Sequence, residues 1–325
     1  MHEQSRDGEP AAGKAAGGEA RGTHRKVVAG VDIGGTNLRV GLVDEALRLH
    51  RAQRVGSQGL LGGDEPLAAL AQFLTGYLAE NLRPGDELIA VSLGFPSTVD
   101  AARRRVISTS NIPSIQDVDV PAALSVLGVP VLLDRDVNML LRHDTRQLGL
   151  NDAAGAVLGC YIGTGFGSAL AVDGQIFVGR HGVAGELGHI PFPGVDIVCG
   201  CGNTGCAETV ASGMALEREL RAAHDGVPIK EVFTRCGGES FVTEWLEYVA
   251  ATVATAVNIL DPTAVIVGGG VTQTKGFPRQ RFEAALGRMV RKPLPAHDLA
   301  LHYAQPGHHS GILGAAIYAF GRAVV

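Results

Sequence analysis

The chain of 325 residues is long enough for two domains of ordinary size, each with its own hydrophobic core. Hydrophobic residues make up 46% of it and charged residues 19%, which excludes an intrinsically disordered chain. The net charge of −5 provides neither a basic surface for nucleic acid nor a basic stripe for an anionic membrane. No apolar run is long enough to span a bilayer, so the sequence predicts a soluble cytoplasmic protein without nucleic-acid or membrane partners.

The first 26 residues differ from the rest because they are rich in Gly, Ala and charged residues and contain no apolar run. They lack the apolar core of a signal peptide, and their composition predicts a disordered leader. A regulatory tail is the functional alternative.

The first folded segment predicts a β-hairpin followed by alternating helix and strands. The β-branched runs 27–31 and 38–43 flank a Gly34-Gly35 turn. Residues 65–82 have apolar residues at helical spacing and a proline near the start, which indicates a helix. Short buried strands are expected at 88–93 and 129–133.

A second block repeats the opening hairpin. Residues 30–44 align without gaps on residues 159–173, and five of the fifteen positions are identical. The agreement covers strand, turn and strand in one register, so it predicts two related α/β halves that face each other across a cleft.

The rest of the chain alternates helix and strand again. A long helix is expected over 240–260, and Asp261-Pro262 ends it because proline cannot continue a helix. A strand over 264–271 and a closing helix over 311–323 follow. This alternation predicts an α/β architecture.

Three glycine-rich turns are candidates for nucleotide binding, since turns without side chains expose backbone N–H groups to phosphate oxygens. The first turn, Gly34-Gly35, follows Asp32, a carboxylate at the strand end, where a magnesium ion on the phosphates would need a ligand. The second turn, 163–165, would hold the phosphates from the opposite side. The third turn, 268–270, would leave open space beside the nucleotide. For any single turn an ordinary hairpin is the alternative. The predicted nucleotide-binding residues are Asp32, Gly34, Gly35, Thr36, Asn37, Gly163, Thr164, Gly165, Gly269 and Gly270.

Four residues have the spacing of a zinc site: His189, Cys199, Cys201 and Cys206. The chain has five cysteines, and their odd number and tight clustering argue against a disulfide framework. One nitrogen and three thiolates complete a tetrahedral shell without an open position, so the predicted Zn²⁺ is structural. Three unligated cysteines on a flexible loop are the alternative.

Carboxylates near the predicted zinc loop are candidates for hydroxyl recognition. Glu186 and His189 are three residues apart, so one turn would present both on one side. Glu208 follows the last cysteine. Asp136 follows a predicted strand, where α/β proteins place catalytic groups, and it is the candidate base for phosphoryl transfer. Asp134 is its rival, and a surface turn is the structural alternative.

These motifs together resemble the ROK family (repressors, open reading frames and kinases) of the hexokinase–actin superfamily. The resemblance rests on DIGGTN (32–37), GVAGELGH (182–189) and CGCGNTGCAE (199–208), and it covers the chain from Lys26 onwards. It implies two ribonuclease-H-like domains that close around a central cleft, with a zinc-bound loop.

The domain limits that follow are a leader at 1–26, a small domain at 27–138 and a larger domain at 139–309 that carries the zinc loop 189–206. The helix 310–325 would return to the small domain. The resemblance also implies a dimer or tetramer.

The resemblance implies ATP-dependent phosphorylation of a hexose at its 6-hydroxyl, with Mg²⁺ and structural Zn²⁺. Asp136 then corresponds to the base that deprotonates the primary hydroxyl. The implied sugar contacts are Asn111, Asp136, Glu186, His189 and Glu208. His189 would serve both zinc and sugar.

One departure concerns the preferred sugar. Glucokinases of the family usually have Asn-Asp at the base, whereas Arg135 precedes Asp136 here. The combination of GFPSTV (94–99), STSNIP (108–113), DRDVN (134–138) and GVAGELGHIPF (182–192) is most similar to that of D-allose kinases, which implies conversion of D-allose to D-allose 6-phosphate. A glucokinase, fructokinase or N-acetylmannosamine kinase, a sugar-responsive repressor and a non-enzymatic zinc scaffold are the alternatives.

Overall fold

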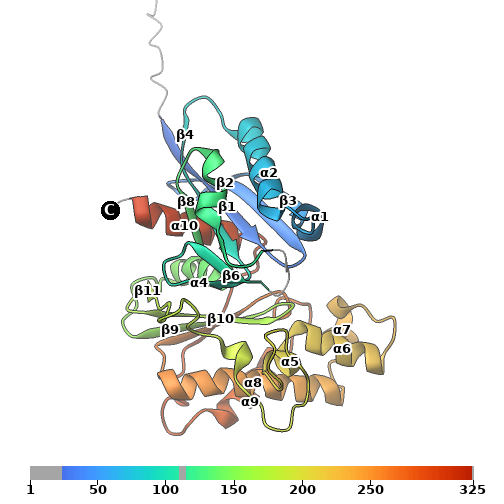
Figure 1. Cartoon of the computed structure of the whole chain (residues 1–325). Helices are drawn as coiled ribbons and strands as arrows, with labels where there is room; N and C mark the ends of the chain where they lie inside the picture. The colour runs from blue at the N-terminus through green and yellow to red at the C-terminus, as the bar shows by residue number, and fades with distance from the viewer. Residues whose placement is uncertain (1–23, 110–114, 324–325) are drawn as a thin grey trace, which may run out of the picture.

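The computed structural model describes residues 24–109 and 115–323. Two five-stranded sheets organise this part of the chain, one above the other in Figure 1. The first has the order β3-β2-β1-β4-β8 and the second the order β11-β10-β9-β12-β13. Both begin with an antiparallel hairpin and continue with parallel strands, so the predicted internal repeat is confirmed as a shared topology.

The bounds of the elements are as follows. The first sheet contains β1 (Arg25–Ile33), β2 (Asn37–Asp44), β3 (Leu49–Gly56), β4 (Asp86–Phe95) and β8 (Val131–Arg135). The second contains β9 (Ala156–Ile162), β10 (Phe166–Val172), β11 (Gln175–Ile176), β12 (Ala264–Gly268) and β13 (Leu301–Tyr303). A small third sheet contains β5 (Thr98–Val99), β6 (Arg105–Ser108) and β7 (Val118–Asp119).

The helices connect and cover these sheets. The α-helices are α1 (Ser57–Leu61), α2 (Pro66–Asn81), α3 (Val120–Ala123), α4 (Asp136–Gln147), α5 (Glu208–Ala211), α6 (Gly213–Ala223), α7 (Val232–Arg235), α8 (Ser240–Leu260), α9 (Arg279–Met289) and α10 (Ser310–Ala323). The 3₁₀ turns are η1 (Ser125–Leu127), η2 (Leu187–His189) and η3 (Ile229–Glu231).

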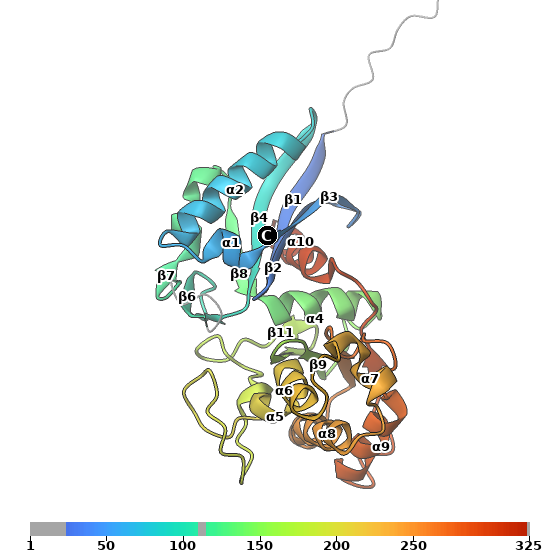
Figure 2. The ribbon, with the colours of Figure 1, turned by 90° about the vertical axis from the view of Figure 1, so that its right-hand side faces the viewer.

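Layers of helices bury both faces of each sheet. Helix α2 covers one face of the first sheet and α10 the other. Helix α4 covers one face of the second sheet, and α6, α8 and α9 cover the opposite face. Figures 1 and 2 show α4 and α10 side by side between the two sheets, and these helices are in contact.

A glycine allows α4 and α10 to approach closely. A Cβ atom on Gly314 of α10 would collide with the backbone carbonyl oxygen of Met139 in α4. The same two helices bury Met139, Ala315 and Tyr318 between them. The C-terminal helix therefore packs on the helix that begins at Asp136.

Most predicted elements are confirmed with small changes in their bounds. The long helix spans Ser240–Leu260, and Asp261 ends it in a left-handed conformation with φ of 43°. The predicted strand 129–133 instead spans Val131–Arg135, because pairing with β4 extends to Phe95↔Arg135. The predicted strand 264–271 ends at Gly268, because Gly269 has a φ of +95° that an extended strand does not allow.

Two of the predicted domain limits, at residues 26 and 138, can be compared with the bounds of β1 and α4. The leader was expected to reach residue 26, but β1 already includes Arg25 and Lys26, and Arg25 forms an ion pair with Asp86 at 2.7 Å. Residues 1–23 lie outside the described part. The expected boundary at residue 138 lies inside α4, and the domain limits stay a prediction. No helix among the described residues is long and apolar enough to cross a membrane.

Candidate functional site

Two carboxylates meet at one edge of the first sheet. Asp32 lies near the end of β1, and Asp136 begins α4 directly after β8. Strands β1 and β8 both run parallel to β4, so their carboxyl ends share this edge. Burial and the negative charge of Asp32 raise the pKa of Asp136 to about 7. Burial also raises the pKa of Asp32, against the effect of Arg39, whose Nη1 lies 3.4 Å from Asp32 Oδ2.

The surroundings of Asp134 differ from those of Asp136. Asp134 is 1% exposed, and its carboxylate is fixed by Arg103 at 3.2 Å, Arg142 at 3.2 Å and Asn138 at 2.7 Å. Asp136 is half-buried, and its Oδ1 accepts a bond of 2.8 Å from the N–H of Val137. Asp134 is therefore a structural anion, and Asp136 is the better candidate for a base.

The first two glycine turns have three residues each and equivalent positions in their sheets. Residues 34–36 connect β1 to β2, and residues 163–165 connect β9 to β10. Hydrogen bonds hold the carbonyl side of each turn: Ser57 Oγ donates to Gly34 O at 2.6 Å, and Gly213 N donates to Gly163 O at 2.9 Å. Thr36 and Thr164 are exposed at the tips. Asn37 supports the first turn, since its carbonyl accepts from Gly34 N at 2.9 Å.

The third glycine turn does not leave open space along its whole length. Gly268 is buried at the end of β12, and a Cβ on Gly269 would collide with the backbone of Ile162. Only Gly270 has open space at its Cβ position. The expectation for Gly269 is corrected in this respect: this glycine is needed for close packing against β9.

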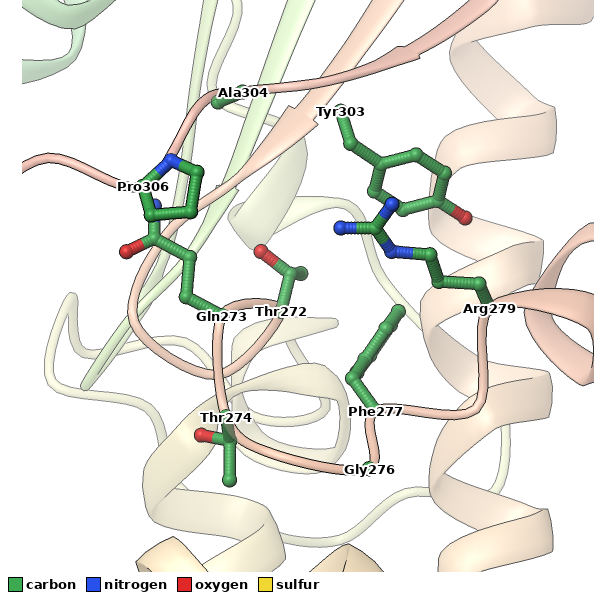
Figure 3. A pocket seen from close by; sticks show the side chains of 9 residues that line it. All are labelled: Thr272, Gln273, Thr274, Gly276, Phe277, Arg279, Tyr303, Ala304 and Pro306. Carbon is green, nitrogen blue, oxygen red and sulfur yellow. The ribbon is translucent and has the colours of Figure 1, made fainter.

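A pocket of about 200 Å³ lies beyond this turn (Figure 3). Gln273 and Pro306 lie on one side of it, and Tyr303 and Arg279 on the other. The Arg279 guanidinium lies 4.2 Å from the centroid of the Tyr303 ring. The pocket therefore offers a flat aromatic and cationic wall beside polar groups of residues 272–274.

The four predicted zinc ligands converge. The ligand atoms of His189, Cys199, Cys201 and Cys206 all lie within 4.8 Å of one another. His189 Nδ1 is 3.6 Å from Cys199 Sγ, and Cys201 Sγ is 3.6 Å from Cys206 Sγ. Tetrahedral zinc with Zn–S bonds of about 2.3 Å places its ligand atoms about 3.5 to 3.8 Å apart. The donor set and spacing fit Zn²⁺, and all five cysteines are free of disulfides.

The carboxylate of Glu186 lies between His189 and Arg135, the residue before Asp136. Glu186 Oε2 is 3.7 Å from His189 Nε2, as the spacing of three residues predicted. Glu186 Oε1 is 2.5 Å from Arg135 Nη2, an ion pair that was not predicted. Glu208, by contrast, lies at the second glycine turn, where its Oε2 accepts from Phe166 N at 2.9 Å. Asn111 lies outside the described residues.

Comparisons with known proteins agree with this geometry. The family model "ROK family" matches residues 28–321. The chain belongs to the ROK family. An N-acetylmannosamine kinase of Salmonella arizonae is 28% identical over 297 residues, which are 90% of this chain and 97% of that relative.

Two solved structures extend the comparison. A ROK family glucokinase of Streptomyces griseus, solved with glucose and AMPPNP, has a TM-score of 0.77 and 26% identity, and covers 91% of this chain and 99% of its own. A ROK hexokinase of Thermus thermophilus has a TM-score of 0.72 and 29% identity, with coverage of 92% and 99%. The predicted hexokinase- and actin-like α/β fold class is thereby confirmed.

Sequence reasoning missed two partners of the acidic residues in this ROK protein. Arg39 lies opposite Asp32 in the β1–β2 hairpin, and the register of a three-residue turn could have shown this. The ion pair between Arg135 and Glu186 had no sequence signal, because 51 residues separate its partners and the chain between them contains a whole hairpin.

Proposed function

We propose that this ROK protein is an ATP-dependent sugar kinase, and that it phosphorylates the 6-hydroxyl of D-allose. The observation that carries the kinase proposal is the half-buried Asp136 at the sheet edge shared with Asp32: its carboxylate forms no ion pair among the described residues, and its pKa is raised although the charge of Arg135 lowers it. The kinases among the relatives support the same reaction class.

In the proposed reaction Asp136 accepts the proton of the sugar hydroxyl. The hydroxyl oxygen then forms a bond to the γ-phosphorus of ATP, the bond from that phosphorus to the bridging oxygen breaks, and ADP leaves. Phosphoryl transfer needs positioning and charge neutralisation more than covalent chemistry. Asp136 would therefore act mainly by orienting and deprotonating the acceptor.

The two acidic groups fit a divalent cation between them and the phosphates. Asp32 raises the pKa of Asp136 through its negative charge, so a cation at this edge would stabilise both ionised carboxylates. Asp32 would hold Mg²⁺, which neutralises charge on the phosphate oxygens when bound. The two glycine turns, 34–36 and 163–165, would then hold phosphate oxygens with their N–H groups.

The pocket beside Gly270 is the proposed place for the base of the nucleotide. Its Tyr303 and Arg279 offer a flat surface for stacking, and Gln273 and Thr272 offer donors and acceptors. A base bound there would leave the phosphates directed along the glycine turn toward β9 and β10.

The proposal for D-allose rests on Arg135 and on the resemblance of the surrounding segments. Arg135 is engaged with Glu186, so the hydrogen-bonding surface that the sugar meets differs from one with a neutral amide at this position. Glucose and N-acetylmannosamine are the sugar alternatives, and the relatives above are named for them or solved with them.

A coupled ATP-turnover assay on D-allose, D-glucose, D-fructose and N-acetylmannosamine tests both the kinase activity and the preference for D-allose. We expect kcat/KM to be highest for D-allose by tenfold or more, which is about 1.4 kcal/mol of transition-state discrimination. A different preferred sugar would overturn the D-allose proposal and leave the kinase. No turnover on any sugar would overturn the kinase and favour a sugar-binding regulator.

A further inference from the structure

Arg135 takes no part in the proton or phosphoryl transfer proposed above, and its contacts indicate how it could affect the choice of sugar. It is the last residue of β8, and its side chain is only 6% exposed. Its Nη1 donates to the carbonyl oxygen of Ala184 at 3.0 Å, and its Nη2 lies 2.5 Å from Glu186 Oε1. One planar guanidinium therefore holds both the backbone and the side chain of the segment that leads into η2.

The carboxylate of Glu186 is held at one oxygen by this arrangement. Oε1 contacts the arginine, and Oε2 lies 3.7 Å from Nε2 of His189. The other nitrogen of that imidazole faces Cys199. A carboxylate side chain has three rotatable bonds, and the contact of Oε1 with the Arg135 guanidinium restricts them. About a third of the Glu186 side chain stays exposed, so it can still accept a bond from a ligand.

A second buried arginine holds the same segment. Arg103 donates to the carbonyl oxygens of Gly182 at 3.2 Å and Val99 at 3.3 Å. Gly182 lies so close to residues 99–101 that a Cβ there would collide with the Val99 carbonyl oxygen. The backbone of residues 182–184 is thus anchored to the first half of the chain independently of Glu186, and the distinct contribution of Arg135 is to orient the carboxylate.

The ion pair between Arg135 and Glu186 matters because of the position of Arg135 in the chain. The next residue is Asp136, the proposed base, so the guanidinium connects the base to an acceptor some fifty residues away. The separation between Asp136 and Glu186 decides which hydroxyls of a sugar can meet Glu186 while one hydroxyl lies at the base. Rigid acceptors discriminate epimers well, because a misplaced hydroxyl leaves a polar group unpaired.

We propose that Arg135 is a positioning residue that sets sugar selectivity by orienting Glu186 relative to Asp136. This rests on the proposed sugar kinase function. Without the guanidinium, Glu186 would rotate among several conformations, the protein would bind the sugar more weakly, and it would discriminate between epimers less. The nucleotide would not be affected, because none of the described contacts of Arg135 reaches the glycine turns or the pocket beside Gly270.

Three variants at the pair, with one control, test the proposal. Arg135→Gln removes the charge, Arg135→Lys keeps the charge but loses the planar fork, and Glu186→Gln removes the carboxylate. Arg221→Gln is the control, since Arg221 forms an exposed ion pair with Glu217 on α6. The measurements are sugar binding by titration calorimetry, kcat and KM for D-allose and D-glucose, KM for ATP, and thermal unfolding.

We expect Arg135→Gln to raise the dissociation constant and the KM for D-allose about tenfold or more, with the KM for ATP unchanged. The ratio of kcat/KM for D-allose over D-glucose should move toward one, and Arg135→Lys should recover part of it. Adding Arg135→Gln to Glu186→Gln should have little further effect, because both changes remove the same contact.

Three results would overturn the proposal. One is an unchanged selectivity ratio in an Arg135→Gln protein that unfolds at the wild-type temperature. Another is an equal loss for sugar and ATP in both Arg135 variants, since a general loss of structure predicts that. The third is full additivity with Glu186→Gln. If the wild-type protein phosphorylates no sugar, the proposed function itself fails, which these outcomes do not resemble.

Discussion

Asp134 and Asp136 show how surroundings separate two identical side chains. Asp134 points into a buried group of two arginines and an asparagine, whereas Asp136 has neither arginine nor lysine on its carboxylate among the described residues. The sequence DRD could not separate them, because the difference depends on Arg103, which comes from a distant segment, and on Arg142, two turns along α4. The structure makes Asp134 part of the framework, whereas Asp136 forms no ion pair among the described residues.

Replacing each aspartate by asparagine should therefore affect different properties. Asp134→Asn leaves the buried Arg103 and the partly exposed Arg142 without their carboxylate, so we expect a loss of about 3 kcal/mol in the free energy of unfolding. Asp136→Asn should keep the wild-type stability or exceed it above pH 7. The reason is that its raised pKa disfavours the ionised form in the folded state, so its contribution to stability is lost as pH rises through about 7. Urea unfolding at pH 6 and pH 8 measures both effects.

The raised pKa of Asp136 predicts the pH dependence of turnover. A base must be ionised to accept a proton, and burial with the charge of Asp32 places this ionisation near pH 7 rather than near 4. We expect kcat/KM for the sugar, at saturating ATP and Mg²⁺, to be flat at high pH and to fall about tenfold per pH unit below a break that lies under this value, because bound Mg²⁺ would stabilise the ionised carboxylate. A profile that stays flat down to pH 5 would contradict the role of Asp136.

At the scale of elements, the loop from His189 to Cys206 has little regular structure, and the four candidate zinc ligands converge in it. Two isolated bridges, Pro191↔Cys206 and Val198↔Thr204, hold it, and three of its glycines have positive φ. Backbone hydrogen bonds, such as Phe192 N to Gly205 O and Cys199 N to Asn203 O at 2.7 Å each, also hold the loop, so a bound metal would add to its order. The sequence predicted the ligand set because all four residues lie within one short segment.

Removing one thiolate should release zinc and loosen the loop 189–206. For Cys201→Ala we expect less than stoichiometric zinc by atomic absorption and an increased KM for the sugar, because His189 and Glu186 lose their fixed position. Cys236→Ala is the matched control, since Cys236 is buried in the core of the second sheet and should keep one zinc per chain. Full zinc content in Cys201→Ala would show that the ligand assignment is wrong.

The contact between α4 and α10 can be tested by adding a single methyl group. Gly314→Ala places a methyl group against the Met139 carbonyl, so we expect a loss of about 1 to 3 kcal/mol in the free energy of unfolding. Gly321→Ala in the same helix meets no atom within 4 Å and should stabilise by about 0.5 kcal/mol. Equal effects of both substitutions in thermal unfolding would mean that α10 does not pack on α4 as described.

At the scale of the whole molecule, the two sheets share one strand order, and the sequence already indicated this. The alignment of residues 30–44 on 159–173 works because a hairpin with a three-residue turn is a local pattern. Helices 66–81 and 240–260 were also predictable, since proline and apolar spacing determine them locally. Domain limits and oligomeric state are not local properties, and both stay predictions.

The contacts of the candidate site also separate into local ones, which the sequence predicted, and long-range ones, which it did not. Residues near one another in sequence, such as Glu186 with His189 or the three cysteines, were correctly expected to meet. Contacts between distant segments were not foreseen, and among them are Arg135 with Glu186 and Glu208 with the turn at Gly165. The Gly268–Gly270 turn was misjudged in part, because only the packing of Gly269 against β9 shows which glycine is open.

Transfer of phosphate from γ-labelled ATP to D-allose in a rapid-quench experiment, with wild-type protein and Asp136→Asn side by side, tests the account most directly. We expect the wild-type protein to form labelled sugar 6-phosphate. The variant should still bind sugar and nucleotide but transfer the label about 10² to 10⁴ times more slowly, because it lacks the base. Label that stays in ATP with the wild-type protein, or transfer at an equal rate by the variant, would contradict a sugar kinase that uses Asp136.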